Sequence, residues 1–170
     1  MAGHLLVVML FILSPLLHEN DFREQRARLG GWTLDIRKDV FTGRQACRLR
    51  RGEVYYERRA LVFQLGGRAD TSQAAYRIDG GPAYQVAADQ VELARLGFEL
   101  QGEDLFNPSG GVVRVTLARL GAARRVDIAP KLYGPSRRFD VEGLGQALRK
   151  ARAWCAEADF DRPTDFGGAA

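Results

Sequence analysis

The sequence predicts a mainly β fold, an antiparallel β-sandwich or partly open barrel, with a short helix and a C-terminal helix pinned by a disulfide. Three observations lead to this prediction. Short segments in which apolar and polar residues alternate run through most of the chain, between turns rich in Gly, Asp and Pro. The two segments with helical periodicity do not alternate with the strands, which disfavours a doubly wound parallel sheet. Both cysteines fall on the apolar faces of their segments.

The N-terminal segment predicts export. Residues 1–17 contain no Asp, Glu, Lys or Arg, and an unbroken apolar run extends from Leu5 to Leu13. This run is shorter than the about 20 residues that cross a bilayer, and it fits the core of a secretory signal peptide. A buried N-terminal strand or helix of a cytoplasmic domain and a short uncleaved anchor are the alternatives. We expect a signal peptide at 1–20, an exposed lead-in at 21–30, a single β-rich domain at 31–157 and a flexible tail at 158–170.

The first half of the domain reads as strands. In residues 31–37, Trp32, Leu34 and Ile36 share one face. In residues 45–50, Cys47 alternates with arginines, and residues 54–65 form a long segment rich in β-formers. Residues 74–86 predict a hairpin, because alternating residues flank the turn Asp79-Gly80-Gly81.

The second half contains both helix candidates. Residues 88–97 predict a short helix with Asp89 as N-cap, Glu92 as its capping-box partner and Gly97 at the C-terminal cap. The remaining expectations are strands at 98–101, 112–117 and 124–130, a turn at 107–111, a loop at 131–138, an extended stretch at 139–141 and a final helix ending at Cys155.

The two cysteines are predicted to form a disulfide. Cys47 lies on the inward face of its strand, and Cys155 continues the helix face of Leu144 and Leu148. Two inward cysteines in an exported chain are typical of a disulfide, which here closes a loop of more than 100 residues. The chain-entropy contribution of such a loop is roughly 4–5 kcal/mol. Two buried free thiols in a cytoplasmic protein are the alternative.

Short motifs along residues 31–155 point to a family. They are a Trp-led strand, YRIDGG, ELARLGFEL, VVRVTL and RFDVEGLGQALRKARAWC. In this order the chain resembles the bacterial invasion-associated locus B family of small periplasmic or secreted proteins. The family segment F-x-L-x-G-x-x-x-A-L corresponds to Phe139, Val141, Gly143, Ala147 and Leu148, its ID-G turn to Ile78, Asp79 and Gly80, and its R-x-G segment to Arg95-Leu96-Gly97. The resemblance implies an exported β domain, associated with stress or host contact in some members, and no catalytic residues.

Arginine dominates the basic residues, because 22 of the 25 are Arg. Arg forms planar, bidentate contacts with phosphate and carboxylate, so an anionic surface or lipid headgroups are candidate partners. The candidate anion-binding residues are the pairs Arg124-Arg125 and Arg137-Arg138. Because neighbours on a strand point to opposite faces, we expect the pairs to be spread over the surface and favour an ordinary solvated face. No common nucleic-acid-binding signature is present, which disfavours nucleic acid as a partner.

Catalysis has few candidates. Both histidines, His4 and His18, leave with the signal peptide, so the mature chain has no imidazole for a Ser-His-Asp or Cys-His site or for zinc. Two carboxylates acting as a glycosidase pair are the remaining option. The candidates in or near strands and turns are Asp79, Glu99, Glu103, Asp104, Asp127 and Asp140. Neither phosphate-binding glycine motif is present, and we expect no cofactor and no metal.

The sequence therefore favours a non-enzymatic, periplasmic or secreted domain that binds an unidentified envelope or extracellular partner. The alternatives are a histidine-independent envelope hydrolase with paired carboxylates and a carrier with a β cavity for a lipid or small ligand. Two inward carboxylates about 5–10 Å apart in a cleft favour the hydrolase. An apolar cavity favours the carrier, and a filled core with a flat basic or aromatic patch favours the binding domain.

Overall fold

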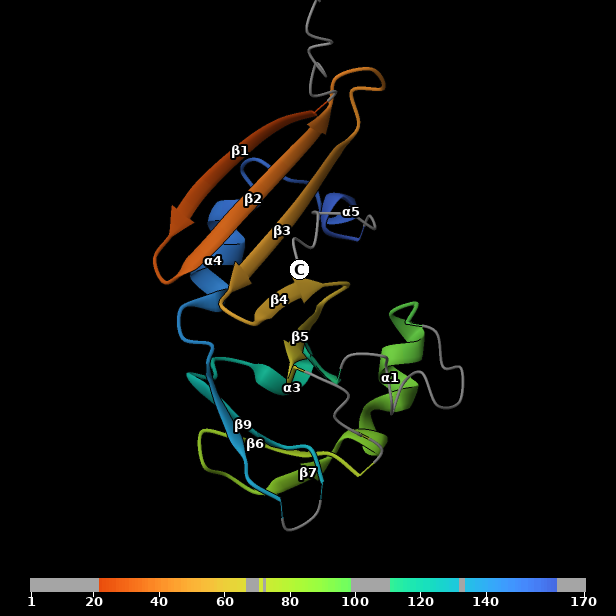
Figure 1. The fold of residues 1–170 in the computed structure, drawn as a ribbon, viewed down its shortest axis with the longest axis vertical. Coiled ribbons are helices and arrows are strands. Elements are labelled where there is room, and N and C mark those ends of the chain that lie inside the picture. Colours follow the sequence, from red (N-terminus) through yellow and green to blue (C-terminus); the bar gives the residue numbers. More distant parts are fainter. Residues whose placement is uncertain (1–21, 67–70, 72, 99–110, 132–133, 162–170) are drawn as a thin grey trace, which may run out of the picture.

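The computed structural model contains two antiparallel sheets, which confirms the predicted mainly β fold, and the sheets are not closed into a barrel (Figure 1). It describes residues 22–66, 71, 73–98, 111–131 and 134–161. The predicted signal peptide lies outside these residues. So do the strand expected at 98–101 and the turn expected at 107–111, apart from Phe98 and Gly111.

The larger sheet has six strands. In spatial order they are β1 (Phe22–Leu29), β2 (Trp32–Asp39), β3 (Gln45–Arg51), β4 (Val54–Glu57), β5 (Ala60–Gln64) and β8 (Val112–Thr116). The first five follow one another along the chain, so each pairs with its neighbour through a short turn. β8 joins the edge by pairing with β5.

The smaller sheet has four strands. Their spatial order is β10 (Arg137–Asp140), β9 (Arg125–Ala129), β6 (Ala75–Ile78) and β7 (Ala83–Gln85). The hairpin predicted at 74–86 is present as β6 and β7. Its turn is tied to β9, because the Asp79 carboxylate accepts hydrogen bonds from the backbone N–H groups of Arg124 and Arg125.

Short helices connect and cover the sheets. They are the 3₁₀ helix η1 (Val86–Asp89), α1 (Gln90–Arg95), α3 (Leu117–Leu120), α4 (Leu144–Ala151) and α5 (Glu157–Phe160). α4 packs behind β1 and β2, and α5 lies against β3. The lower part of the large sheet faces the small sheet, where the rings of Phe63 on β5 and Phe139 on β10 meet edge to face at 5.2 Å (Figure 1).

The core follows the period-2 pattern of the strands. Trp32, Leu34 and Ile36 on β2 are buried, while the residues between them are half-buried on the opposite face. Inward residues of both sheets, α4 and α5 form one continuous buried cluster. A second, small cluster of Ala60, Leu93 and Phe98 covers the outer side of β5, which explains why β5 is buried on both faces.

The predicted disulfide is confirmed. It joins Cys47 on β3 to Cys155, which are 108 residues apart in the chain. Gln45 Nε2 donates a 2.6 Å hydrogen bond to the carbonyl oxygen of Trp154 beside it. The disulfide therefore attaches the segment between α4 and α5 to the large sheet.

Several boundaries differ from the sequence-based expectation. The segment expected as an exposed lead-in forms β1; its side chains are mostly exposed, but Leu29 is buried against the core. β10 begins at Arg137, inside the expected loop 131–138. The final helix stops at Ala151 and Cys155 follows a turn, although the helix face predicted to be apolar is buried.

The start of the expected tail is ordered as α5. Phe160 is buried, and its ring meets Tyr56 edge to face at 5.3 Å. A flexible tail is expected from residue 158, because chain termini are commonly frayed. Packing of Phe160 onto β4 instead orders the chain through Phe160.

The long segment 54–65 forms two strands. Glu57 pairs with Ala60 across a two-residue turn in which Arg58 and Arg59 have φ of 44° and 60°. Positive φ at both positions is the geometry of a type I′ hairpin turn, which usually contains Asn or Gly. Two arginines give no such signal in the sequence, so this turn could not be predicted from local composition.

Candidate anion-binding face

The structure does not bring the four predicted anion-binding arginines together. Arg137 is used within the fold, because it pairs with Glu53 and donates to the Leu65 carbonyl oxygen. Arg124 is exposed and directly precedes β9. Arg125 and Arg138 meet at the carboxylate of Asp127, with Nε–O distances of 3.2 and 3.0 Å. Only these two arginines share a site.

Arginines gather instead on the outer side of β1, β2 and β3. The register places Arg26 opposite Asp35 and Asp35 opposite Arg48, so these three residues cross the strands in one row. The next rows on the same side of the sheet, two residues farther along each strand, are Glu24–Arg37–Ala46 and Arg28–Thr33–Arg50. We call this surface the arginine face; its charged residues are Glu24, Arg26, Arg28, Asp35, Arg37, Arg48 and Arg50. The sequence-based expectation concerned adjacent arginines, which point to opposite faces of a strand. The arginines of this face are instead two residues apart on their strands, so they share a side, and strand pairing aligns them.

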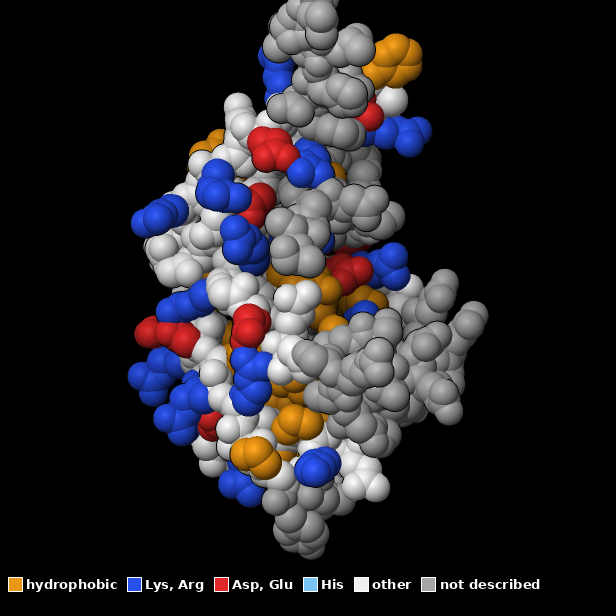
Figure 2. All heavy atoms as spheres, viewed as in Figure 1, with side chains coloured by type: hydrophobic (Ala, Val, Ile, Leu, Met, Phe, Trp, Pro, Cys, Tyr) orange, Lys and Arg blue, Asp and Glu red, His pale blue; other side chains and the backbone are white. Residues whose placement is uncertain are grey.

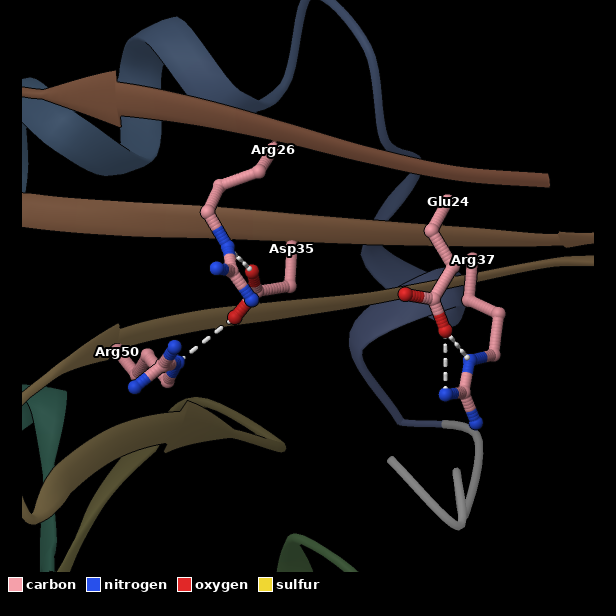
Figure 3. A network of polar contacts seen from close by, with 5 residues as sticks. All are labelled: Glu24, Arg26, Asp35, Arg37 and Arg50. Atoms are coloured by element: carbon pink, nitrogen blue, oxygen red, sulfur yellow. Dashed lines mark hydrogen bonds and ion pairs between the residues drawn. The ribbon is translucent and has the colours of Figure 1, made fainter. Parts of the chain in front are cut away.

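Two acids hold three of the five arginines in place. Figure 3 shows Arg26 and Arg50 directed at Asp35 from the neighbouring strands, with Nε–O distances of 2.5 and 2.7 Å. Arg37 donates to Glu24 at 2.5 and 2.9 Å in a second pair farther along the strands. These contacts fix the guanidinium groups on the sheet, which lowers the entropy lost when they bind an anion.

The ionised state of Asp35 is favoured by its arginine partners. Burial by itself would raise the pKa of this carboxyl, but hydrogen bonds from Arg50 and Arg26 outweigh burial and hold the pKa below its ordinary value. At neutral pH Asp35 therefore carries a full negative charge shared by two guanidinium groups. The cluster of three residues retains one excess positive charge.

The arginine face as a whole is positively charged. Its five arginines exceed its two acids by three charges. Arg48 lies over the ring of Tyr55, with 5.3 Å between its guanidinium carbon and the ring centroid. Figure 2 shows blue Lys and Arg side chains around the red acids over β1–β3. The side chains are exposed or half-buried, whereas the opposite side of these strands packs on α4 and α5.

An exposed apolar tip lies at one end of this face. Val40 and Phe41 occupy the turn between β2 and β3, and Phe41 is 96% exposed, the most exposed large hydrophobic residue among those described. Asp39 holds the turn by accepting hydrogen bonds from the N–H groups of Phe41 and Thr42, both at 2.8 Å. We call Val40 and Phe41 the apolar tip.

The candidate carboxylates do not form a pair among the described residues. Asp79 accepts from backbone N–H groups of β9, and Asp127 is bound by two arginines. Asp140 pairs with Arg51. The other three candidates, Glu99, Glu103 and Asp104, lie outside the described residues.

The sequence did not reveal that Asp89 is a buried acid. It occupies the N-cap position of α1 as predicted, but its side chain makes no capping hydrogen bond. Instead it is 3% exposed and bound by Tyr76 and Arg119. A capping signal and a buried ion pair use the same residue type, so sequence could not separate them.

Within the described residues, no group of three or more His, Cys, Asp or Glu side chains is arranged to hold a metal ion. In the same part of the chain no helix has the length and apolar character needed to span a bilayer. No protein-family model, curated protein or solved structure matches the chain.

Proposed function

We propose that this chain is an exported, non-enzymatic β domain that binds the anionic lipid headgroups of an envelope membrane. The arginine face supplies the headgroup contacts, and the apolar tip enters the interface beside it. The observation that carries the proposal is the alignment of five arginines on one outer sheet surface next to the exposed Phe41. Neither feature by itself distinguishes a membrane from a soluble polyanion, but their combination favours a membrane surface.

The geometry of a sheet suits an extended layer of phosphates. Strands lie about 4.8 Å apart and residues on one face of a strand about 7 Å apart, so the arginine face is a regular two-dimensional array. Each basic residue near an anionic surface contributes about 1 kcal/mol. Arginine adds bidentate hydrogen bonds to phosphate, which lysine does not form. Three excess charges therefore contribute about 3 kcal/mol to the binding free energy.

The apolar tip supports a membrane rather than a soluble polyanion. An aromatic ring exposed at a turn gains hydrophobic free energy at the headgroup–acyl boundary, as apolar residues of interfacial proteins do. A soluble polyanion gives such a ring no apolar environment. Stable binding of a peripheral protein to a membrane commonly combines an apolar anchor with a basic surface, and this protein has both.

Two further observations support export. A disulfide is typical of proteins from oxidising compartments. The apolar run of residues 5–13 has the length of a signal-peptide core. The resemblance to the invasion-associated locus B family, which rests on the short motifs quoted above, agrees with both.

The test is co-sedimentation of the disulfide-bonded full chain with phosphatidylglycerol vesicles across a range of salt concentrations. Neutral phosphatidylcholine vesicles measure any contribution of the apolar residues near the N-terminus. The triple variant Arg26→Gln/Arg28→Gln/Arg48→Gln should lose on the order of a hundredfold in affinity, because three contributions of about 1 kcal/mol are removed. Wild-type affinity should fall as salt rises, since the contacts are with exposed charges.

Matched controls separate the arginine face from net charge. The variant Arg95→Gln/Arg149→Gln/Lys150→Gln removes three charges from α1 and α4 and should retain nearly wild-type binding. Phe41→Ser should weaken binding, whereas Val91→Ser, at an exposed position on α1, should not. Equal losses in the two triple variants, or binding to soluble polyphosphate without binding to vesicles, would overturn the proposal.

A catalytic or carrier role has less support. The inward side chains of both sheets form one continuous buried cluster, as the binding domain requires. The described candidate carboxylates are each bound by arginine or backbone N–H groups rather than by one another.

A further inference from the structure

The outer face of the small sheet contains a hollow of about 400 Å³ that is separate from the arginine face. Two rows of side chains cross the sheet there. The first row runs from Arg138 on β10 through Asp127 on β9 to Arg77 on β6 and Ala83 on β7. The second places Ala129 opposite Ala75 and Ala75 opposite Gln85.

Three alanines explain why the surface is hollow. Ala75, Ala83 and Ala129 lie on adjacent strands and all line the depression. Directly opposed side chains in a sheet have Cβ atoms about 5 Å apart, so longer side chains would fill this space. The alanines leave an apolar floor, and the longer side chains around them form the walls.

The walls are positively charged. Arg77, Lys131 and Arg138 line the hollow, and Asp127 is its only acid among the described lining residues. Asp127 is already bound by Arg138 and Arg125. In the part of the chain that the structure describes, neither Arg77 nor Lys131 has an acidic partner within ion-pair distance. Asp127 lies opposite Arg77 in the register, but three basic residues against one acid leave an excess of two positive charges among the described lining residues.

We infer that this hollow binds a small organic anion, with a carboxylate or phosphate group contacted by Arg77 and Lys131 and a compact body on the alanine floor. The volume is within the range of small-ligand sites, about 300–1,000 Å³. Arg77 supplies bidentate donors and Lys131 a mobile positive charge. Gln85 and Ser136 offer neutral hydrogen-bonding groups for the rest of the ligand.

Asp127 has a selecting role in this site. It holds Arg138 and Arg125 at one side of the hollow, and its own charge repels a second anionic group placed there. The inference goes beyond membrane binding, because the hollow lies on a different sheet and takes a soluble ligand.

The test is isothermal titration calorimetry of the disulfide-bonded full chain with gluconate, which has a single carboxylate, and with glucose 6-phosphate. Glucose and inorganic phosphate are the comparison ligands. Binding of gluconate alone assigns a carboxylate ligand, and binding of glucose 6-phosphate alone assigns a phosphate ester; both support the inference. Arg77→Gln should weaken binding about tenfold or more, because a charge-assisted hydrogen bond is lost. Ala129→Leu should abolish binding by filling the floor without changing charge.

Two control variants test whether loss of binding is specific to residues of the hollow. Arg95→Gln removes an exposed charge from α1, and Ala118→Leu adds the same bulk on α3; both should bind as the wild type does. The Arg26/Arg28/Arg48 triple variant should also bind the small anion with wild-type affinity. The anion site can therefore be tested even if the protein does not bind membranes. Wild-type affinity in Ala129→Leu, no heat with either organic anion, or equal affinity for inorganic phosphate and glucose 6-phosphate would overturn the inference.

Discussion

The hydroxyl group of Tyr76 donates a 2.5 Å hydrogen bond to Oδ2 of Asp89 in the interior of the molecule. Arg119 Nε donates to the other carboxylate oxygen at 3.0 Å, and its guanidinium group lies over the ring of Tyr84. Tyr84 in turn stacks on Tyr76 with 5.5 Å between ring centroids. These four residues connect β6, β7, η1 and α3, and so join the small sheet to the connection after β8.

Removing the Tyr76 hydroxyl should destabilise the fold. In Tyr76→Phe the buried Asp89 carboxylate loses one of its two side-chain donors, and a hydrogen bond to a charged group contributes about 1.5–3 kcal/mol. We expect a loss of that size in the free energy of unfolding, measured by urea denaturation. Tyr84→Phe keeps the stacked ring and should change stability by less than about 0.5 kcal/mol. Equal effects of the two substitutions would contradict this assignment.

Stability should decrease at alkaline pH. Burial, together with hydrogen bonds to Glu157 and Asp89, raises the pKa of Tyr56 and Tyr76 above the ordinary value of 10.0. The folded protein thus retains the phenolic protons above pH 10, where the unfolded chain releases them. The contribution of these two groups to the free energy of unfolding is then fully present and independent of pH below about pH 10. Above it that contribution is lost, at a rate approaching about 1.4 kcal/mol per pH unit for each tyrosine.

Urea denaturation between pH 8 and 11 measures this dependence. The double variant Tyr56→Phe/Tyr76→Phe should be less stable at pH 8 but should lose less stability on going to pH 11. A slope as steep as that of the wild type would show that other groups cause the alkaline loss.

Reduction of the Cys47–Cys155 disulfide should destabilise the protein without changing its strand order. The bond closes a long loop, and removing such a native disulfide typically costs about 2–5 kcal/mol. The urea midpoint should therefore fall when reductant is added. Cys47→Ala/Cys155→Ala should match the reduced wild type and show no response to reductant. An unchanged midpoint in the reduced wild type would mean that packing of α5 and the hydrogen bond from Gln45 to the Trp154 carbonyl oxygen already supply the attachment.

The turn between β4 and β5 should accept glycine with a gain in stability. Arg59 has a φ of 60°, a conformation that costs an L-residue about 1–2 kcal/mol and glycine much less. Arg59→Gly should raise the free energy of unfolding by about 0.5–1 kcal/mol after the entropy cost of glycine. Arg59→Ala keeps the Cβ atom and should give no gain, so equal stabilisation by alanine would contradict the strain explanation.

Local pattern accounts for much of the fold. Alternation identified the inward faces of β2 and β3 and placed Cys47 among the core residues, because the side-chain period of a strand is a local property. The Asp79-Gly80 pair predicted the β6–β7 turn, because Asp and Gly are favoured in tight hairpin turns. Both residues have positive φ in the structure. Arg58 and Arg59 are not residue types that favour positive φ, so the sequence did not predict a turn there. The pairing of β4 with β5 imposes the positive φ values.

The candidate surfaces could be predicted only in part. Arg48 and Arg50 are two residues apart in a segment predicted as a strand, so the sequence indicates that they share a face. Arg26 and Arg28 have the same spacing, but their segment was expected to be an exposed lead-in rather than a strand. The sequence does not state that β1, β2 and β3 are adjacent or that Asp35 lies between Arg26 and Arg48. Likewise, Ala75 and Ala129 are unremarkable in sequence and become a floor only because β6 pairs with β9.

The sequence by itself determined the strand-rich composition, the inward cysteines and the abundance of arginine. The tertiary structure decided which arginines act together, which acid is buried and where a hollow remains. The physical reason is that side-chain alternation depends on neighbouring residues, whereas strand register depends on hydrogen bonds between segments that lie far apart in the chain.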